Sequence, residues 1–270
     1  MVPTRDAERL STRVRSDEAL TVSEHIAIVT GGSRGIGRAT VQRLAADGGQ
    51  VLTCGRGARP GDLPDGIEWV QADVADPSQA AGVVARANDL HGPVSLLVNN
   101  AGVQVERTVA DSTDDDWDLV VGVNCRGPFN LSRAVLPQMA EHGGVIINIG
   151  SVSDTSADPS MALYNSSKAF VHGLTRSIAV DHGPRVRCNA ISPGWIDTGM
   201  ADEAFALAGD PESARDDALA RHPAGRLGVP EDIANTVAWL ASAQAEFVTG
   251  QCFTVDGGLT AASPLRPGLF

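Results

Sequence analysis

Seven short apolar segments, rich in β-branched residues, alternate with segments of helical periodicity along most of this chain. The apolar segments are HIAIVT, QVLTC, IEWVQ, PVSLLVNN, GVIINIG, RVRCNAIS and QCFTVDGG. Between them lie helix-like stretches such as GIGRATVQRLAAD. Because successive parallel strands are joined by helical crossovers, this alternation predicts an α/β fold in which helices cover both faces of a parallel sheet.

Length and composition place these segments in one domain. The chain has 270 residues, 43% of them hydrophobic, which is enough for one large core. No repeat, low-complexity linker or composition break occurs between residues 23 and 258, so this range is predicted to be a single domain. Residues 1–22 are expected to form a flexible arm and residues 259–270 a C-terminal tail. The interval 197–250 is predicted to hold two or three helices, with a substrate flap at about 199–222.

The charge of the chain argues against two classes of partner. It carries 33 acidic and 21 basic residues, a formal charge of -12, which repels nucleic-acid phosphates and anionic membrane surfaces. No run of about 18 apolar residues occurs, and the charged N-terminus lacks the apolar centre of a secretory signal. We therefore expect a cytoplasmic protein. The four cysteines are far apart, which favours reduced thiols over a disulfide framework, and no metal cluster is visible.

A glycine-rich turn follows the first predicted strand. The segment TGGSRGIGRAT places Gly31, Gly35 and Gly37 at the start of a helix. Glycines permit a tight turn and let the backbone approach a pyrophosphate, whose charge suits a helix N-terminus. The spacing G-x-x-x-G-x-G differs from the general G-x-G-x-x-G fingerprint, so a merely structural turn is the alternative interpretation.

The end of the second predicted strand bears on the choice between NADP(H) and NAD(H). Dinucleotide-binding domains that prefer NAD carry an acidic residue there, which accepts hydrogen bonds from the adenosine ribose. This chain has Gly55 at that position, followed by Arg56, and Arg34 projects from the glycine turn towards the same region. Two guanidiniums can bind a ribose 2′-phosphate, so NADP(H) is predicted over NAD(H). Alternatively, both arginines are ordinary surface residues.

The segment MALYNSSKAF places Tyr164 and Lys168 four positions apart on a predicted helix. Side chains at this spacing share one helix face, so the ammonium is expected to lower the pKa of Tyr164 from its usual value of about 10. Such a tyrosine can exchange a proton with a carbonyl that receives hydride. Ser151, thirteen positions earlier at the end of a strand, supports this interpretation. The alternative is a half-buried tyrosine beside a solvated lysine.

The segment DSTDDDWDLVVGVNCRGPFNLSRAVLPQMAEHGG is predicted to form one long helix. Ser112 or Thr113 can cap it, with the acidic run 114–116 at the positive end of its dipole. Asn124 lies midway along it and tends to bond backbone groups, which can distort a helix locally. A satisfied interior amide or a solvent-facing residue is the alternative to a functional role.

Further motifs accompany these features: DV at 73–74, NNAG at 99–102, ISPGWIDT at 191–198 and TGQCFTVDGG at 249–258. Together with the glycine turn and YNSSK at 164–168, in this order and spacing, they resemble the short-chain dehydrogenase/reductase family over about residues 24–258. The resemblance implies a doubly wound Rossmann sheet of seven parallel strands, with a nicotinamide cofactor across the carboxyl ends of the strands.

The resemblance also implies roles for individual residues. Tyr164 transfers the proton, Ser151 holds the substrate oxygen, and Lys168 also contacts the nicotinamide ribose. Asn124 supports a water relay to the lysine. Asp73 and Val74 frame the adenine, Thr198 fixes the nicotinamide side, and the segment 99–102 flanks the adenosine ribose. The residues expected to bind the cofactor are Gly31, Ser33, Arg34, Gly35, Ile36, Gly37, Arg56, Asp73, Val74, Asn99, Ala101, Gly102, Tyr164, Lys168, Pro193, Gly194, Ile196 and Thr198.

The implied activity is interconversion of a secondary alcohol and a ketone, with hydride passing between C4 of the nicotinamide and the substrate carbon. Two alternatives stay open. A 3-oxoacyl-thioester reductase of the same family is disfavoured because family members with that activity are more basic along the ends of the two long helices, where this chain has PQMAEHGG and SIAVDHGP. A non-catalytic NADP(H)-binding sensor is disfavoured because the four catalytic residues are intact. An epimerase or dehydratase acting on nucleotide sugars needs a larger C-terminal substrate domain.

Substrate choice is expected to come from loops rather than from the fold. The expected pocket residues are Ser153, Trp195 and Met200, with Trp195 either a pocket wall or a core residue. The flap carries more acidic than basic side chains, which predicts a neutral ketone or alcohol. The helices at 113–141 and 162–181 carry more apolar surface than one sheet face covers. The family resembled commonly packs these helices against copies of themselves, so the resemblance implies a homotetramer, or a dimer.

Overall fold

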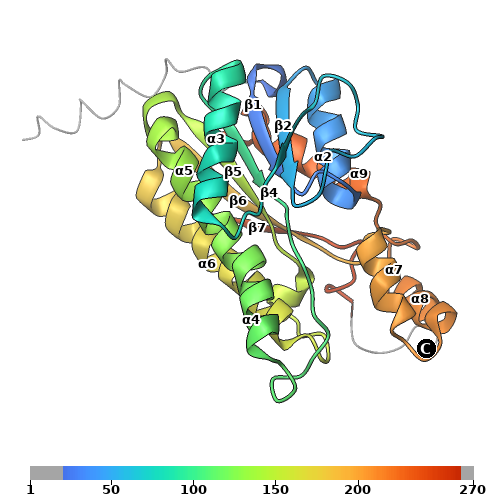
Figure 1. Ribbon diagram of the computed structural model, residues 1–270. Helices are drawn as coiled ribbons and strands as arrows, with labels where there is room; N and C mark the ends of the chain where they lie inside the picture. The colour runs from blue at the N-terminus through green and yellow to red at the C-terminus, as the bar shows by residue number, and fades with distance from the viewer. Residues whose placement is uncertain (1–20, 263–270) are drawn as a thin grey trace, which may run out of the picture.

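The structure, a computed structural model, describes residues 21–262. Seven parallel strands form one sheet in the order β3-β2-β1-β4-β5-β6-β7 (Figure 1). The strands are β1 (Ile26–Thr30), β2 (Gln50–Gly55), β3 (Glu68–Gln71), β4 (Leu96–Asn99), β5 (Gly144–Ile149), β6 (Val186–Pro193) and β7 (Cys252–Val255). The predicted doubly wound parallel sheet is confirmed. Most of the predicted arm, and much of the predicted tail, lies outside the described residues.

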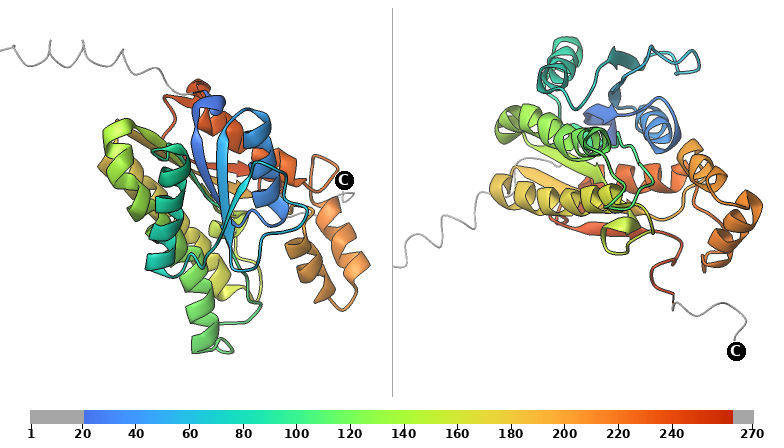
Figure 2. Two further views of the ribbon diagram at one scale, coloured as in Figure 1. Left: turned by 45° about the horizontal axis from the view of Figure 1, so that its top comes forward. Right: turned by 60° about the horizontal axis from the view of Figure 1, so that its bottom comes forward.

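Two layers of helices cover the sheet (Figure 2). One face carries α3 (Pro77–His91), α5 (Gly127–His142) and α6 (Ala162–His182), and the other carries α2 (Gly35–Ala46) and α9 (Pro230–Ala241). The central strands are therefore buried on both faces, which is why they read as continuous apolar runs rather than alternating ones. Buried Leu131 and Met139 of α5 and Leu44 of α2 are each fully enclosed in these two layers.

The predicted long helix is interrupted by a π-helical turn. It consists of α4 (Asp114–Val121), the π segment η2 (Gly122–Arg126) and α5. Thr113 caps it, because its hydroxyl accepts a hydrogen bond from the Asp116 N–H and the Asp116 carboxylate accepts one from the Thr113 N–H. The π turn contains Asn124, the residue at which the sequence predicts local distortion.

The order of the strands creates a crevice at one edge of the sheet. The chain runs outward from β1 through β2 to β3 and then returns to place β4 on the other side of β1. The connections after β1 and β4 diverge at this switch point, where open α/β sheets bind their ligands. The predicted flap lies beside this edge as α7 (Gly199–Ala206) and α8 (Pro211–Ala220) (Figure 1). Together with α9, these are the helices predicted for residues 197–250.

Short 3-10 turns complete the described chain: η1 (Val22–Glu24), η3 (Val152–Asp154) and η4 (Ala243–Ala245). Between residues 21 and 262, every helix is either too short or too polar to cross a lipid bilayer. Within the same range, no three His, Cys, Asp or Glu side chains gather in a way that could hold a metal ion.

Candidate active site

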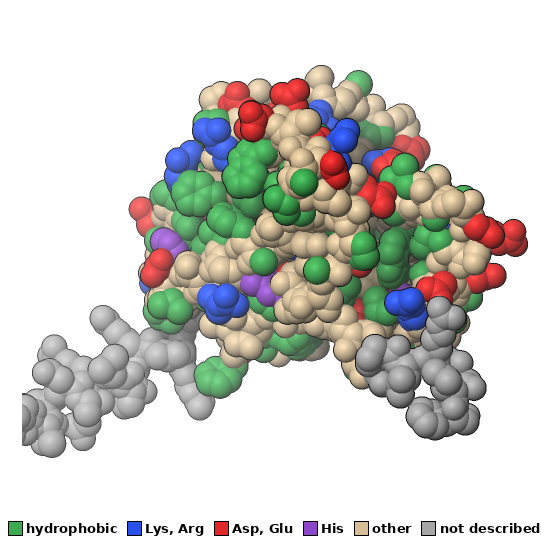
Figure 3. All heavy atoms as spheres, turned by 90° about the horizontal axis from the view of Figure 1, so that it is seen from below, with side chains coloured by type: hydrophobic (Ala, Val, Ile, Leu, Met, Phe, Trp, Pro, Cys, Tyr) green, Lys and Arg blue, Asp and Glu red, His purple; other side chains and the backbone are tan. Residues whose placement is uncertain are grey.

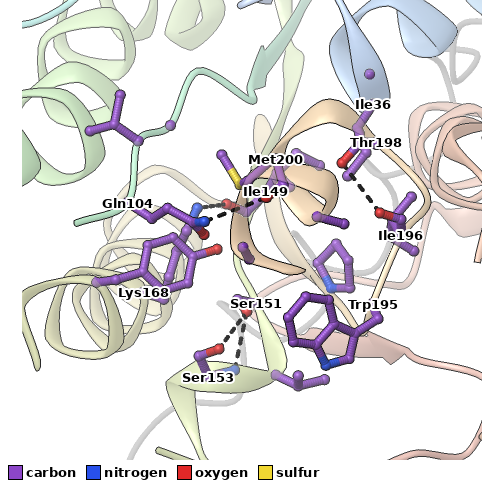
Figure 4. Close-up of a pocket in the computed structure, with 18 of the residues that line it drawn as sticks. Ile36, Gln104, Ile149, Ser151, Ser153, Lys168, Trp195, Ile196, Thr198 and Met200 are labelled. Carbon is purple, nitrogen blue, oxygen red and sulfur yellow. Dashed lines mark hydrogen bonds between the residues drawn. The ribbon is translucent and has the colours of Figure 1, made fainter. Parts of the chain in front are cut away.

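A cavity of about 1560 Å³ opens at the carboxyl edge of the sheet. Figure 3 views this edge, with a recess beside the flap, and Figure 4 shows part of the lining. The cavity brings together residues that lie more than 160 positions apart in the sequence. The predicted residues that line it are Gly31, Ser33, Arg34, Gly35, Ile36, Gly37, Arg56, Asp73, Val74, Ala101, Gly102, Ser151, Ser153, Tyr164, Lys168, Pro193, Gly194, Trp195, Ile196, Thr198 and Met200.

Asn99 is not among the lining residues, although the sequence places it beside the adenosine ribose. Its side chain is 3% exposed and donates hydrogen bonds to Asn148 at 2.8 Å and Ser132 at 3.3 Å. Asn100 lines the cavity instead, and its amide donates to the carbonyl of Thr30 at 2.8 Å. Successive strand residues point to opposite faces, so a motif with two adjacent asparagines does not reveal which one faces the crevice.

The glycines of the turn are required by backbone conformation at Gly31 and Gly35 and by space at Gly37. Gly31 and Gly35 have φ angles of +73° and +57°, and a Cβ on Gly37 would lie 2.3 Å from the carbonyl oxygen of Gly31. The turn ends at the N-terminus of α2, whose free N–H groups favour an anion. Arg38, which sequence reasoning missed, supports the turn by donating to the carbonyls of Gly32 at 3.0 Å and Ser33 at 2.9 Å. The turn therefore fits a pyrophosphate.

Position 55, at the end of β2, is a glycine because Trp69 packs against it. A Cβ on Gly55 would lie 2.8 Å from Cη2 of Trp69, so the indole of β3 occupies the space of a side chain at this position. Arg56 is exposed at the cavity edge. Arg34 also lines the cavity, and its Nη1 donates to Oε1 of Glu203 on α7 at 3.0 Å. Arg34 therefore contacts the flap as well as the cavity.

Helix α6 carries Tyr164 and Lys168 on one face, and β5 ends just before Ser151. Nζ of Lys168 lies 5.5 Å from the centroid of the Tyr164 ring and donates to the Ile149 carbonyl at 3.0 Å (Figure 4). The lysine is 5% exposed, so the alternative of a solvated lysine is wrong. Burial lowers its pKa to about 8.

The tyrosine does not behave as the sequence predicts. Burial raises the pKa of Tyr164 to about 12. The Ser151 hydroxyl opposes this shift, and the negative charges of Asp158 and Asp154 contribute to it. The expected lowering by Lys168 is therefore corrected. Loss of solvent is the largest cause, because it disfavours the charged phenolate. The phenol is protonated at neutral pH, which suits a proton donor.

Asn124 holds the loop after β4 against the π turn. Its carbonyl oxygen accepts from the Val103 N–H at 2.9 Å, and its amide donates to the Val103 carbonyl at 2.8 Å and to Ser167 at 2.9 Å. Asn124 is 1% exposed and does not line the cavity. A Cβ on Gly102 would be 3.6 Å from both the Asn124 oxygen and Nζ of Lys168, so the amide and the ammonium flank the same glycine.

A chain of hydrogen bonds leads away from Ser151. Its Oγ donates to Oγ of Ser153 at 3.0 Å and accepts from the Ser153 N–H at 3.1 Å (Figure 4). Ser153 in turn donates to Oδ2 of Asp158 at 2.6 Å. Asp158 lines the cavity and was missed by sequence reasoning, which offers no motif for it.

The segment predicted as a flap lines one part of the cavity. Trp195, at the end of β6, stacks on Phe205 of α7, with ring centroids 4.7 Å apart and planes at 18°. The indole is partly buried against Phe205 and also lines the cavity. Gln104 donates to the Met200 carbonyl at 3.5 Å and joins the loop after β4 to the flap (Figure 4). The stack of Trp195 on Phe205 and the Gln104–Met200 hydrogen bond therefore connect α7 to the rest of the cavity lining.

Comparison with known proteins decides the family. The model of a family described as enoyl-(acyl carrier protein) reductase matches residues 31–260. The chain is 35% identical to a 3-oxoacyl-(acyl-carrier-protein) reductase of Thermotoga maritima, covering 87% of this chain and 97% of the relative. The chain belongs to the short-chain dehydrogenase/reductase family.

Other relatives of this short-chain dehydrogenase/reductase act on different substrates. An NADP-dependent (R)-specific alcohol dehydrogenase of Lentilactobacillus kefiri is 35% identical, with 87% of this chain and 96% of the relative covered. A 2-(S)-hydroxypropyl-CoM dehydrogenase of Xanthobacter autotrophicus is 38% identical, with 89% and 98% covered. The ligand-free aldohexose dehydrogenase of Thermoplasma acidophilum superposes with a TM-score of 0.83 at 34% identity, with 89% and 95% covered. The chain is therefore an oxidoreductase acting on CH–OH or C=O groups.

Proposed function

We propose that this short-chain dehydrogenase/reductase is an NADP(H)-dependent ketoreductase or alcohol dehydrogenase acting on a small neutral molecule in the cytoplasm. The observation that carries the proposal is the convergence of Ser151, Tyr164 and Lys168 with the glycine turn on one cavity. When bound, NADP(H) supplies the hydride chemistry. The chain orients the substrate oxygen and supplies the proton.

The proton is assigned to Tyr164. Its pKa of about 12 leaves the phenol protonated at neutral pH, so it can donate to a carbonyl oxygen that gains negative charge. Ser151, which lines the same cavity as Tyr164, holds that oxygen. The buried ammonium of Lys168 stabilises the phenolate that proton donation leaves behind. Asn124 acts on Lys168 through the segment 102–103 that both flank.

The cofactor preference follows from the end of β2. Trp69 excludes a side chain at position 55, so no carboxylate is available there to accept bonds from a ribose, and Arg34 and Arg56 line the cavity. These features suit a 2′-phosphate. The Lentilactobacillus kefiri relative is NADP-dependent, which agrees with this preference.

A second candidate is reduction of 3-oxoacyl thioesters. The Thermotoga maritima relative bears that name. A ketone-bearing substrate fits the same catalytic groups. Turnover of acetoacetyl-CoA, compared with cyclic and aromatic ketones, distinguishes the two candidates.

The assembly proposed is a homotetramer, with a dimer as the alternative. Five large apolar side chains on α4, α5 and α6 are exposed although the sheet is already covered. They are Trp117 (56%), Leu119 (38%), Phe129 (44%), Phe170 (41%) and Val180 (80%). Exposed apolar surface of this kind supports contact with other copies of the chain.

The experiment that tests the function is NADPH consumption at 340 nm against a panel of ketones and 3-oxoacyl thioesters, with Tyr164→Phe beside the unchanged protein. Turnover that falls by about 10²–10⁴-fold in Tyr164→Phe, while NADPH binding persists, supports the assignment. Equal turnover by both proteins overturns the role of Tyr164. Tight NADPH binding without turnover of any panel member favours a non-catalytic sensor.

A further inference from the structure

A buried ion pair lies beneath the loop that carries Ser151. Oδ2 of Asp154 is 2.5 Å from Nε2 of His172, and the two side chains are 1% and 14% exposed. Oγ of Ser192 donates to the same carboxylate oxygen at 2.5 Å and is 3.0 Å from the imidazole nitrogen. The proposed reaction uses none of these three side chains. Burying a carboxylate or a charged imidazole is costly unless the group is paired. Asp154 and His172 each supply the partner that the other requires.

The cluster joins the elements that form the proposed active site. Asp154 ends η3, three residues after Ser151. His172 follows Lys168 by four residues and Tyr164 by eight, so all three share one face of α6. Ser192 belongs to β6, whose end carries Trp195.

The cluster also packs against the backbone that leads into Ser151. A Cβ on Gly150 would lie 3.1 Å from Oγ of Ser192 and 3.3 Å from Oδ2 of Asp154. The peptide before Ser151 therefore rests directly on the cluster. A shift of the carboxylate would move the serine relative to α6.

Building on the proposed function, we propose that Asp154 and His172 are positioning residues of the active site. Their ion pair attaches the Ser151 loop to α6, and at neutral pH the charged imidazole offsets part of the field of the Asp154 carboxylate at Tyr164.

The electrostatics around the pair agree with this role. Hydrogen bonds to Asp154 and Cys252 raise the pKa of His172 to about 9, so the imidazole is charged at neutral pH. Although burial raises the pKa of Asp154, hydrogen bonds from His172 and Ser192 leave it below its usual value. Cys252 of β7 is the other titratable group that faces the imidazole. The charge of Asp154 also reaches Tyr164 and Lys168 and raises the pKa of both.

Tyr164 reports on this field directly because it is the only tyrosine of the chain. Its ionisation is read from the absorbance at 295 nm after a rapid jump to alkaline pH, before the protein unfolds. Asp154→Asn removes the charge and should lower the midpoint by about one pH unit. His172→Gln should leave it nearly unchanged, because His172, with a pKa of about 9, is already neutral at the pH where the phenol ionises. Asp47→Asn, which removes the 2.8 Å ion pair with Arg43 on α2, is the matched control and should leave the midpoint unchanged.

Positioning is tested separately by kinetics with a substrate found on the panel. Asp154→Asn and His172→Gln should each lower kcat by about tenfold while the NADPH dissociation constant stays within twofold, and the double variant should lose no more than the worse single variant. A merely structural role would lower the melting temperature and leave both kcat and the tyrosine midpoint unchanged, and this outcome overturns the proposal. The tyrosine titration needs neither substrate nor cofactor, so it decides the electrostatic part even if the proposed activity fails.

Discussion

Arg34 of the glycine turn and Glu203 of the flap form an ion pair across the mouth of the cavity, with 3.0 Å between Nη1 and Oε1. The side chains are 68% and 61% exposed, so the pair adds little to stability. The Glu203 carboxylate competes with a cofactor phosphate for Arg34, because an arginine bonded to a carboxylate is less available to a phosphate. The ion pair therefore connects the flap with the proposed cofactor preference.

The first prediction concerns this competition. Arg34→Ala should weaken NADPH binding by about tenfold, because a charge-assisted hydrogen bond to the 2′-phosphate is lost, and should leave NADH binding unchanged. Glu203→Gln should strengthen NADPH binding by about threefold by releasing the guanidinium. Fluorescence titration with both nucleotides measures the two effects. Arg86→Ala, on α3 and outside the cavity, is the control. Equal changes for NADH and NADPH would contradict the assignment of Arg34 to the phosphate.

The second prediction concerns the glycine turn. Gly37→Ala would place a methyl group 2.3 Å from the Gly31 carbonyl oxygen and 2.4 Å from the Asn100 amide nitrogen. It should cost about 1–3 kcal/mol of unfolding free energy and abolish nucleotide binding. Gly82→Ala, in the exposed interior of α3 with nothing within 4 Å, should instead stabilise by about 0.5–1 kcal/mol. Urea unfolding compares the two. Tight nucleotide binding by Gly37→Ala would show that the turn does not contact the phosphates.

The third prediction links stability to the buried lysine. The unfolded chain keeps the Lys168 proton to about pH 10.5, and the folded protein only to about pH 8. Burial of the ammonium therefore lowers stability below pH 8, and this cost disappears as the pH rises to 10.5. Lys168→Met should raise the unfolding free energy at pH 7 by about 2 kcal/mol and remove activity. The gain should shrink towards pH 10. A Lys168→Met protein that is less stable at pH 7 would mean that the hydrogen bond to Ile149 outweighs the burial of charge.

The fourth prediction concerns the aromatic stack at the flap. Trp195→Ala removes both a cavity wall and the contact with Phe205, which is worth about 0.5–1.5 kcal/mol beyond the area it buries. The substrate KM should rise about tenfold, while NADPH affinity stays within twofold. Trp195→Phe preserves the stack and should retain most of the substrate affinity. A parallel loss of NADPH affinity in Trp195→Ala would show that the flap supports the cofactor instead.

The fifth prediction concerns assembly. Light scattering should give a mass near four times the 28.0 kDa of the chain. Phe170→Asp on the exposed face of α6 should reduce it to two chains or one, since a charge replaces apolar contact surface. Leu207→Asp, 67% exposed in the flap, should leave the mass unchanged. A single-chain mass for the unchanged protein would overturn the proposed tetramer.

The sequence by itself determined the features that depend on local periodicity and spacing. Seven apolar runs separated by helical segments predict the parallel sheet, because side-chain burial on both faces leaves no alternation in the strands. The spacing of Gly31, Gly35 and Gly37 predicts the phosphate turn, and four residues of separation place Tyr164 and Lys168 on one helix face. Neither prediction requires knowledge of what packs around these residues.

The tertiary structure alone decided properties that depend on neighbours from distant segments. The pKa of Tyr164 is raised rather than lowered because the fold removes solvent from the phenol, which no four-residue motif encodes. Which of Asn99 and Asn100 faces the cavity is set by how β4 sits between β1 and β5. Asp154 and His172 become partners only when α6 packs against β5 and β6. Local spacing determines which side chains share a helix or strand face. Burial and charge pairing depend on contacts between distant segments, which only the tertiary structure determines.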